Sequence, residues 1–319
     1  MPAANSEVCV FSPSLFLTVT IEALADNDDG DDIHFHPGGQ GFWIARMLHH
    51  LGATPVIVAP VGGESGEVLR GLLATWDLTL DAVAINDSSP AYVHDRRDGE
   101  RRELGTSLLP AFNRHEIDTL YGRVLECAVR AGTCIVTGKH PGDHLPVDFY
   151  ERLGADLATT NVDVIGDLHG AELAAFLRGG PLHTLKVSDS DFVEDGELAE
   201  GASVSARFEA IERYSPKKVS RLVISADKMP TVAQFETRRF TAEAPMLESV
   251  DHRGSGDSMT AGLALAVLRG LDAIAALQLA CGAGAANVTR HGLGNADAGL
   301  VESLAKQVKV EEVEGMARA

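Results

Sequence analysis

Short apolar runs alternate with helical patterns along most of the chain, and this alternation restricts the fold more than any other feature. The runs are too short for buried helices and lack polar alternation, which is typical of strands buried on both faces of a parallel sheet. We expect such strands at Val8–Val10, Pro55–Val61, Thr133–Thr137, Val162–Ile165, Thr184–Val187 and Arg221–Ser225. Apolar residues at helical spacing predict helices at Gly41–Leu51, Glu67–Thr75, Asn113–Ala131, Pro146–Ala158, Ala171–Arg178, Ser203–Tyr214 and Ser258–Leu268. The pattern predicts an α/β fold with a mostly parallel sheet and helices on both sides.

Two segments depart from this rhythm. Residues 15–35 and 90–107 alternate more like antiparallel strands, and Asp98-Gly99 supplies the positive φ values of a tight hairpin turn. We therefore expect a small β lid, formed by insertions at about 14–36 and 88–107, on one domain that spans residues 1–319.

The chain is strongly acidic, with 46 Asp and Glu against 27 Lys and Arg, a net charge of −19 and a pI near 4.9. This charge repels phosphate backbones and argues against general nucleic-acid binding. The longest apolar stretches, such as 54–61 and 261–268, are far shorter than the about 20 residues that a membrane-spanning helix needs. We expect neither a nucleic-acid partner nor a membrane.

Cysteine usage indicates the compartment. The four cysteines have apolar neighbours and no CxxC spacing; they are Cys9, Cys127, Cys134 and Cys281. Buried, reduced thiols are expected, and the first residues carry no basic region of a secretory signal. Both observations favour the cytoplasm. Neither the acidic run at 26–32 nor the scattered histidines (His34, His36, His49 and His50) has the spacing of a calcium or zinc site.

The strongest chemical signal is DHRGSGDSMTAG at 251–262. Gly254, Ser255 and Gly256 would place consecutive backbone N–H groups at the N-terminus of a helix, where anions and above all phosphate bind. The Asp257 carboxylate, favoured near a helix N-terminus, could take a proton from an attacking hydroxyl. The alternative is an N-capping Asp on a glycine-rich turn. Neither a P-loop nor a dinucleotide GxGxxG motif is present.

The segment 251–262 resembles the D-T-x-G-A-G-D-x-x-x-x-G signature of the PfkB/ribokinase-type carbohydrate kinases, which include 1-phosphofructokinase-like sugar kinases. Other segments resemble family motifs in the same order: HPGGQGFWIARMLHHLG (36–52), VGGESGEVLRGLL (61–73), CIVTGKHPGDHLP (134–146), IGDLHG (165–170), LKVSDSD (185–191) and LVISADKMPTV (222–232). The resemblance implies a ribokinase-like three-layer αβα sandwich with a β lid. This chain would be a divergent member.

The resemblance also implies roles for individual residues. Asp257 matches the catalytic base, and Gly254, Ser255 and Gly256 match the anion hole. The positions that match the substrate side are Phe16, Gly38, Gly39, Gln40, Gly41, Trp43 and Lys139. Those on the nucleotide side are Lys186, Ser188, Ser225, Asp227, Asn287 and Gly292. Asp191 would organise magnesium through water.

Departures from the family pattern gather at the two binding flanks. Phe16, Gln40 and Trp43 stand where the family has Asp, Lys and Asn, and Asp227 and Pro230 replace two glycines. Loss of polar partners weakens binding of a polyol, whereas aromatic rings suit a flat base or a sugar face, or simply pack under the lid. Cations on the lid hairpin could meet a substrate phosphate or remain solvated; they are Arg96, Arg97, Arg101 and Arg102.

These observations predict an ATP- and Mg²⁺-dependent phosphotransferase that phosphorylates a hydroxymethyl group of a sugar or sugar phosphate. Two alternatives stay open: a catalytically impaired nucleotide- or sugar-binding regulatory protein on the same scaffold, and a nucleoside kinase. The resemblance also allows a monovalent cation near residues 288–292 and a homodimer formed through the lid.

Overall fold

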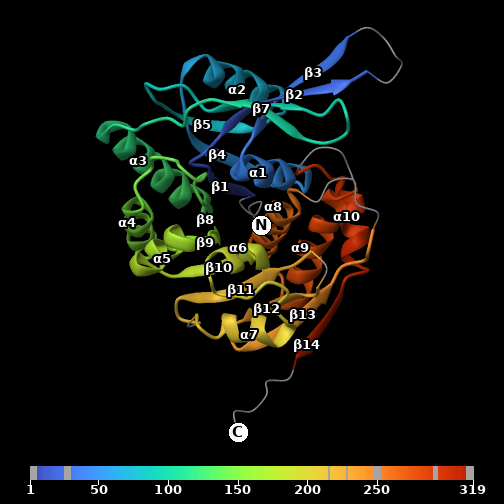
Figure 1. Cartoon of the computed structure of the whole chain (residues 1–319). Helices are drawn as coiled ribbons and strands as arrows, with labels where there is room; N and C mark the ends of the chain where they lie inside the picture. Colours follow the sequence, from blue (N-terminus) through green and yellow to red (C-terminus); the bar gives the residue numbers. More distant parts are fainter. Residues whose placement is uncertain are drawn as a thin grey trace.

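The computed structural model describes residues 6–24, 30–214, 216–227, 229–247, 253–289 and 294–313. A ten-stranded sheet runs through its centre (Figure 1). In order across the sheet, the strands are β14 (Lys309–Val313), β13 (Arg238–Glu243), β12 (Thr231–Phe235), β11 (Val219–Ser225), β10 (Leu182–Ser188), β9 (Asp163–Asp167), β8 (Thr133–Thr137), β1 (Glu7–Phe11), β4 (Thr54–Val61) and β5 (Thr79–Ala84). The seven strands from β11 to β5 are parallel, and the three from β12 to β14 are antiparallel.

All six strands predicted from apolar runs are present, because each lies in the middle of the sheet. In β1, for example, Cys9 lies between Val56 of β4 and Cys134 of β8 and has no exposed surface. Sequence patterns missed β5, β13 and β14, which carry charged residues and are partly exposed, and also β12, which is buried but only five residues long. All four cysteines are buried free thiols, as expected.

Helices cover both faces of the sheet. One face carries α1 (Gln40–His50), α2 (Gly63–Thr75), α8 (Ser255–Leu268), α9 (Ala273–Asn287) and α10 (Ala298–Ala305). The other face carries α3 (Arg114–Ala131), α4 (Asp148–Leu157), α5 (Gly170–Gly179), α6 (Asp189–Glu194) and α7 (Val204–Ile211). Each layer buries its own apolar cluster against the sheet, so the molecule has the predicted three-layer arrangement (Figure 1). None of the described helices is long and apolar enough to cross a membrane.

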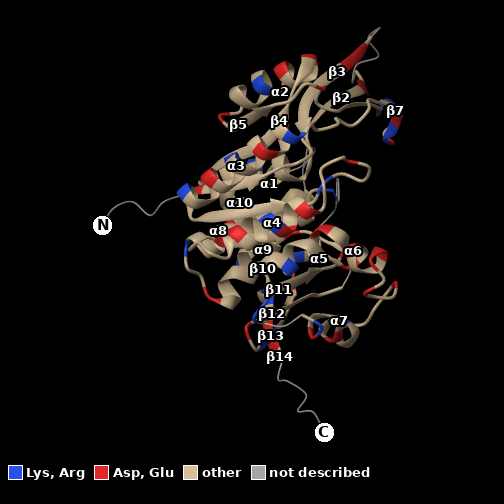
Figure 2. Cartoon of the chain, turned by 90° about the vertical axis from the view of Figure 1, so that its left-hand side faces the viewer, with Lys and Arg blue, Asp and Glu red and all other residues tan. Residues whose placement is uncertain are grey.

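A separate four-stranded sheet forms the lid, at the top of Figure 1. Its order is β3 (Asp31–Gly38), β2 (Phe16–Ala23), β6 (Ala91–Asp95) and β7 (Arg102–Thr106). Both hairpins are antiparallel as predicted, but β2 and β6 pair in parallel, so the lid is a mixed sheet. Only Gly99 of the Asp98-Gly99 pair has a positive φ, of 85°, because six residues rather than two connect β6 to β7. Acidic and basic residues alternate at this hairpin (Figure 2).

Candidate active site

The N-terminus of α8 forms the predicted anion-binding turn. Gly254 is the N-cap residue, with φ 75° and ψ 0°, a conformation that glycine adopts without strain. Within the described part of the chain no side chain caps this helix, and Asp257 lies inside the first turn rather than at the N-cap, so the N-capping alternative for Asp257 is wrong. Asp257 instead lies in the first helical turn, half-buried. The backbone N–H groups of the turn therefore point toward the opening at the helix end, where an anion would be stabilised.

A buried lysine joins this turn to the sheet. Lys186, at the end of β10, lies 3.5 Å from a carboxylate oxygen of Asp167 at the end of β9, and both side chains are about nineteen-twentieths buried. The hydroxyl of Thr260 on α8 donates a hydrogen bond to the same carboxylate. A Cβ atom at Gly256 would lie only 2.5 Å from the Lys186 Nζ. The absence of a side chain at Gly256 thus lets the ammonium reach the anion-binding turn.

The charges around Lys186 are strongly coupled. Burial raises the pKa of Asp257 to about 7, with Asp167 and Asp191 adding to the rise and Lys186 opposing it. Burial also raises the pKa of Asp167, against the pull of Lys186 and the Thr260 hydrogen bond. Although burial by itself lowers the pKa of Lys186, the three carboxylates reverse that effect. Burial and the neighbouring carboxylates thus oppose the ionised form of Asp257, which the N-terminus of the helix would favour.

The nucleotide-side residues lie along the same edge of the sheet. Ser188 and Asp191 form a capping box at the start of α6, in which each side chain accepts a hydrogen bond from the other residue's backbone N–H. The Ser225 hydroxyl donates to the Val187 carbonyl oxygen, which ties β11 to β10. Asp227 is exposed just beyond β11. These positions stay predictions for nucleotide contact.

Asn287 packs behind the turn that precedes α8. Its side-chain amide donates to the Arg253 carbonyl oxygen at 2.7 Å and accepts from the Gly294 backbone N–H at 2.7 Å. Because the side chain is 1% exposed and both of its ends are bonded to backbone, it holds the turn before α8 in place. Asp251 and Gly292 lie outside the described residues.

A cavity of about 230 Å³ brings together five of the seven predicted substrate residues. These five are Phe16, Gly39, Gln40, Trp43 and Lys139. The cavity also reaches Gly138, whose backbone N–H donates to the Asp167 carbonyl oxygen. The predicted substrate side therefore lies next to the edge that carries the coupled charges.

The three predicted glycines do not all face this cavity. A Cβ atom would lie 2.7 Å from the Thr18 hydroxyl at Gly38, and 2.5 Å from the Ser12 Cβ at Gly41. At Gly39, with φ 109°, it would lie 2.3 Å from the Ser14 carbonyl oxygen. The chain's own packing thus requires glycine at all three positions, whatever the substrate.

The aromatic and cationic residues of the cavity are held by protein contacts. Phe16 is 3% exposed, with its ring centroid 5.2 Å from that of Tyr92. Trp43 packs edge-on against Phe42 at 4.6 Å. The Lys139 ammonium donates to the carbonyl oxygens of Asp143 and Leu145, both at 2.9 Å. Each side chain still borders the cavity, so a substrate would meet fixed, preorganised walls.

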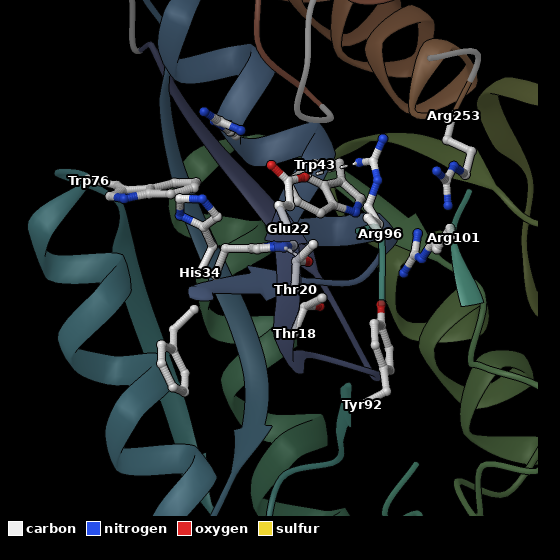
Figure 3. Close-up of a pocket in the computed structure, with 13 residues that line it drawn as sticks. Thr18, Thr20, Glu22, His34, Trp43, Trp76, Tyr92, Arg96, Arg101 and Arg253 are labelled. Carbon is white, nitrogen blue, oxygen red and sulfur yellow. Dashed lines mark hydrogen bonds and ion pairs between the residues drawn. The ribbon is translucent and has the colours of Figure 1, made fainter. Parts of the chain in front are cut away.

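The four lid-hairpin arginines divide into two pairs. Arg97 and Arg102 each bind the buried carboxylate of Asp95 at 2.9 Å. Arg96 and Arg101 instead line a second cavity of about 380 Å³, together with Arg253 (Figure 3). The expected pairing with an acidic residue of the hairpin itself is found for Arg97 and Arg102, whereas Arg96 lies 3.9 Å from Glu22 of β2.

Comparison with known proteins identifies the family. A family model described as "pfkB family carbohydrate kinase" matches residues 17–298, which is most of the chain. This chain belongs to the pfkB family of carbohydrate kinases. It is thus a member of a family of carbohydrate kinases, which are transferases.

Two curated relatives and a solved structure resemble this pfkB-family chain. The ATP-dependent 6-phosphofructokinase isozyme 2 of Escherichia coli K12 is 26% identical over 237 residues, covering 72% of this chain and 74% of the relative. The isozyme from Mycobacterium tuberculosis CDC 1551 / Oshkosh is 25% identical over 291 residues, covering 88% and 83%. The structure of E. coli phosphofructokinase-2 in complex with potassium has a TM-score of 0.81 at 21% identity and covers 94% and 98%. The fold class, a ribokinase-like sandwich with a lid, is confirmed.

Sequence reasoning missed two functional candidates in this pfkB-family chain. Asp167 was placed within a family-like motif but given no role, although its position at the carboxyl end of a parallel strand was a usable signal. Arg253 sits at a variable position of the signature, and only the folded chain brings it against the lid. Among the described residues, no group of three or more His, Cys, Asp and Glu side chains could hold a metal ion by itself.

Proposed function

We propose that this chain transfers the γ-phosphoryl group of ATP to a hydroxymethyl group of a sugar or sugar phosphate, with Asp257 as the general base. One observation carries the proposal: a carboxyl group with a pKa raised to about 7 lies in the first turn of a helix whose N-terminus no side chain caps. A base with a pKa near the working pH combines a useful deprotonated fraction with a useful driving force for proton transfer.

The residues divide the reaction between them. The acceptor enters the 230 Å³ cavity, and its hydroxyl loses a proton to Asp257 as its oxygen attacks the γ-phosphorus. The N–H groups of residues 254–256 and the Lys186 ammonium stabilise the negative charge of the transferring phosphoryl group. Closure of the lid would keep water, a competing acceptor, away from the phosphorus.

Magnesium would be held mainly by the nucleotide. The donors on this edge are carboxylates, which suit Mg²⁺, and Asp191 at the start of α6 would hold the ion through its waters. When bound, the ion would neutralise charge on the phosphate groups. The potassium complex of the E. coli relative supports the proposal of a monovalent cation near residues 288–292, most of which lie outside the described residues.

The two alternatives have less support. A pure binding protein has no evident use for a base of raised pKa beside a buried lysine. A nucleoside kinase would need aromatic rings whose faces are open to the nucleobase of the substrate, whereas Phe16 is almost fully buried against Tyr92.

The lid supports a proposal of homodimer formation. It exposes large apolar side chains, of which Ile33, Phe35 and Leu104 are 51%, 53% and 51% exposed. Exposed apolar groups of this kind on one small sheet favour a protein partner, and a second copy is the simplest. Light scattering would detect a dimer, and Ile33→Lys with Phe35→Lys would return it to a monomer; a wild-type monomer would contradict the proposal.

The decisive experiment measures ADP formation from ATP and Mg²⁺ against a panel of sugars, sugar phosphates and nucleosides. Asp257→Asn should lower kcat about 10²–10⁴-fold through loss of base catalysis. Asp272→Asn is the matched control. Asp272 caps α9, beyond the opposite end of α8 from Asp257, and Asn caps a helix as well as Asp does. Full turnover in Asp257→Asn would refute the assignment of the base. Nucleotide binding without turnover on any acceptor would favour the binding-protein alternative.

A further inference from the structure

Arg207, on α7, has a side chain that is only 1% exposed, which is unusual for a charged residue. Its two terminal nitrogens reach different segments of the chain. Nη2 donates a hydrogen bond to a carboxylate oxygen of Asp189 at 3.0 Å, and Nη1 donates one to the Pro230 carbonyl oxygen at 3.3 Å. One guanidinium group therefore joins the start of α6 to the residue that precedes β12.

The two segments that Arg207 joins lie on the predicted nucleotide side. Asp189 is the first residue of α6 and follows Ser188, which ends β10 and is the N-cap of that helix. Pro230 ends the connection from β11 to β12. Because β10 and β11 are parallel neighbours with Ser188 opposite Ser225, both segments leave the sheet at the same edge. Arg207 holds them from α7, which packs against β12 (Figure 1).

The connection from β11 to β12 is also where the chain departs from the family pattern. Pro230 replaces a glycine of that pattern. Proline fixes its own φ near −65° and has no backbone N–H, whereas glycine leaves the backbone free to adjust. The carbonyl oxygen of this proline is in turn held by Arg207. The end of the connection is thus fixed both by its own ring and by a buried side chain.

Stability alone explains this arginine poorly. The cost of removing a buried ion pair from water largely offsets its attraction, so apolar residues of similar volume often serve as well. Within the described residues the Arg207 Nε finds no hydrogen-bond partner, so burial leaves one N–H group unsatisfied. Asp189 is 35% exposed, and water weakens its attraction to Arg207. The position in which Arg207 holds the two segments explains its burial better.

The charge of this edge gives that position a consequence. Asp189 and Asp191 lie in the first turn of α6, and Asp227 is exposed just beyond β11. Carboxylates on this edge would repel the phosphate groups of a nucleotide. Arg207 binds the Asp189 carboxylate and turns it toward α7. The same contact therefore orients the start of α6 and neutralises one of its charges.

We propose that Arg207 is a positioning residue for the nucleotide, which fixes the start of α6 relative to the connection between β11 and β12. Arg207 itself would not touch the nucleotide, because it is buried beneath both segments. The guanidinium group suits this role, since its rigid, planar fork donates to two oxygens in fixed directions. This inference rests on the proposed kinase function, since it assigns how the binding side of the phosphate donor is held.

Nucleotide binding tests the inference without turnover. Isothermal titration calorimetry would measure the Kd of a non-hydrolysable ATP analogue with Mg²⁺, in the absence of an acceptor. Arg207→Met removes both hydrogen bonds, and Arg207→Met/Asp189→Asn also removes the carboxylate that loses its partner. Arg178→Met is the matched control, because Arg178 forms an exposed 2.8 Å ion pair with Glu151 near the C-terminal end of α5. Thermal unfolding would show that each variant is folded.

Arg207→Met should raise the Kd of the analogue about tenfold, a typical cost of losing a residue that orients direct contacts. The double variant should stay several-fold weaker than wild type, because the bridge to Pro230 is still missing. Arg178→Met should bind the analogue as wild type does. In turnover assays Arg207→Met should raise KM for ATP about tenfold and leave KM for the acceptor within about twofold. A purely structural role would lower the Tm without separating the two KM values.

Two results would overturn the inference and leave the kinase function untouched. The first is a Kd in Arg207→Met equal to that of wild type. The second is full recovery in the double variant, which would mean that Arg207 only neutralises Asp189 and positions nothing. If Arg207→Met does not fold, Arg207→Lys takes its place, since an ammonium group lacks the fork that reaches both oxygens. A wild-type Kd in that variant would likewise overturn the inference.

The same measurements separate the inference from the proposed function. If the analogue binds in an Arg207-dependent way but no acceptor is ever phosphorylated, the inference stands and the proposed catalytic function fails. If wild type binds no nucleotide, both fail.

Discussion

The two ends of the active-site cleft treat charge in opposite ways. At the phosphoryl-transfer end, Lys186 is buried among carboxylates and within 3.5 Å of Asp167, so the protein supplies its own counter-charge. At the lid end, four guanidinium groups line a cavity with the carboxylate of Glu22. A site that balances its own charges is preorganised before the substrate arrives. The lid end gathers its guanidinium groups from separate parts of the chain, so its arrangement depends on the packing of the lid, whereas the balanced end is built by two neighbouring parallel strands.

Replacing Lys186 tests the end of the site where the protein pairs its own charges, and it should have the largest effect on the free energy of unfolding. Lys186→Met leaves the Asp167 carboxyl buried without its cation, and breaking a buried pair from one side typically costs about 3–5 kcal/mol. Urea unfolding should show a loss of this size. The double variant Lys186→Met/Asp167→Asn should recover part of the loss, because no unpaired charge remains. A single variant as stable as wild type would mean that Lys186 and Asp167 are not coupled.

Replacing Gly39, the N-cap residue of α1, should have the next largest effect on the free energy of unfolding. Gly39→Ala forces a Cβ to within 2.3 Å of the Ser14 carbonyl oxygen at a φ of 109°, so the backbone must move. We expect a loss of about 2 kcal/mol, the sum of conformational strain and overpacking. Gly122→Ala, in the middle of α3 with open space around it, is the control and should instead stabilise by about 0.5–1 kcal/mol. Equal effects of the two substitutions on urea unfolding would contradict the packing argument.

The third prediction concerns the pH dependence of turnover, and its expected effect is the smallest of the three. Because the pKa of Asp257 is raised to about 7, its base form is lost as the pH falls through that value. The ratio kcat/KM should therefore drop about tenfold for each pH unit below 7, and level off above it. An acid limb with a midpoint near 4, the usual value for a carboxyl group, would show that the neighbouring charges do not perturb the base.

Much of the fold could be predicted because its signals are local. Six central strands follow from apolar runs, and the Gly-rich turn before α8 follows from residues 254–256. The edge strands β12 to β14 could not be predicted in the same way. β12 is only five residues long and β13 and β14 carry charged residues, so their sequence patterns are weak; they are strands because β11 offers an edge to β12, which in turn pairs with β13 and β13 with β14.

The candidate site was predictable at its centre and less so at its margins. Asp257 and the anion-binding turn lie in one continuous motif, so their spacing alone brings them together. Gly38, Gly39 and Gly41 were predicted from a motif, and the structure adds a reason for glycine that the motif does not contain, namely close contact with Ser12, Ser14 and Thr18. No pattern in the sequence shows which atoms approach a glycine from a distant segment.

The sequence by itself determined the central strands and most of the helices that cover them, the glycine-rich turn at the start of α8 and the acidic character of the chain. The tertiary structure decided which charges meet. Thr260 and Asp167 are 93 residues apart, and their hydrogen bond exists because α8 packs over the end of β9. Arg101 and Arg102 are adjacent in sequence, yet one lines the cavity and the other binds Asp95, because β7 begins at Arg102 and pairs it with Asp95, whereas Arg101 belongs to the connection between β6 and β7. Charge coupling depends on distances across the fold, which the order of residues does not contain.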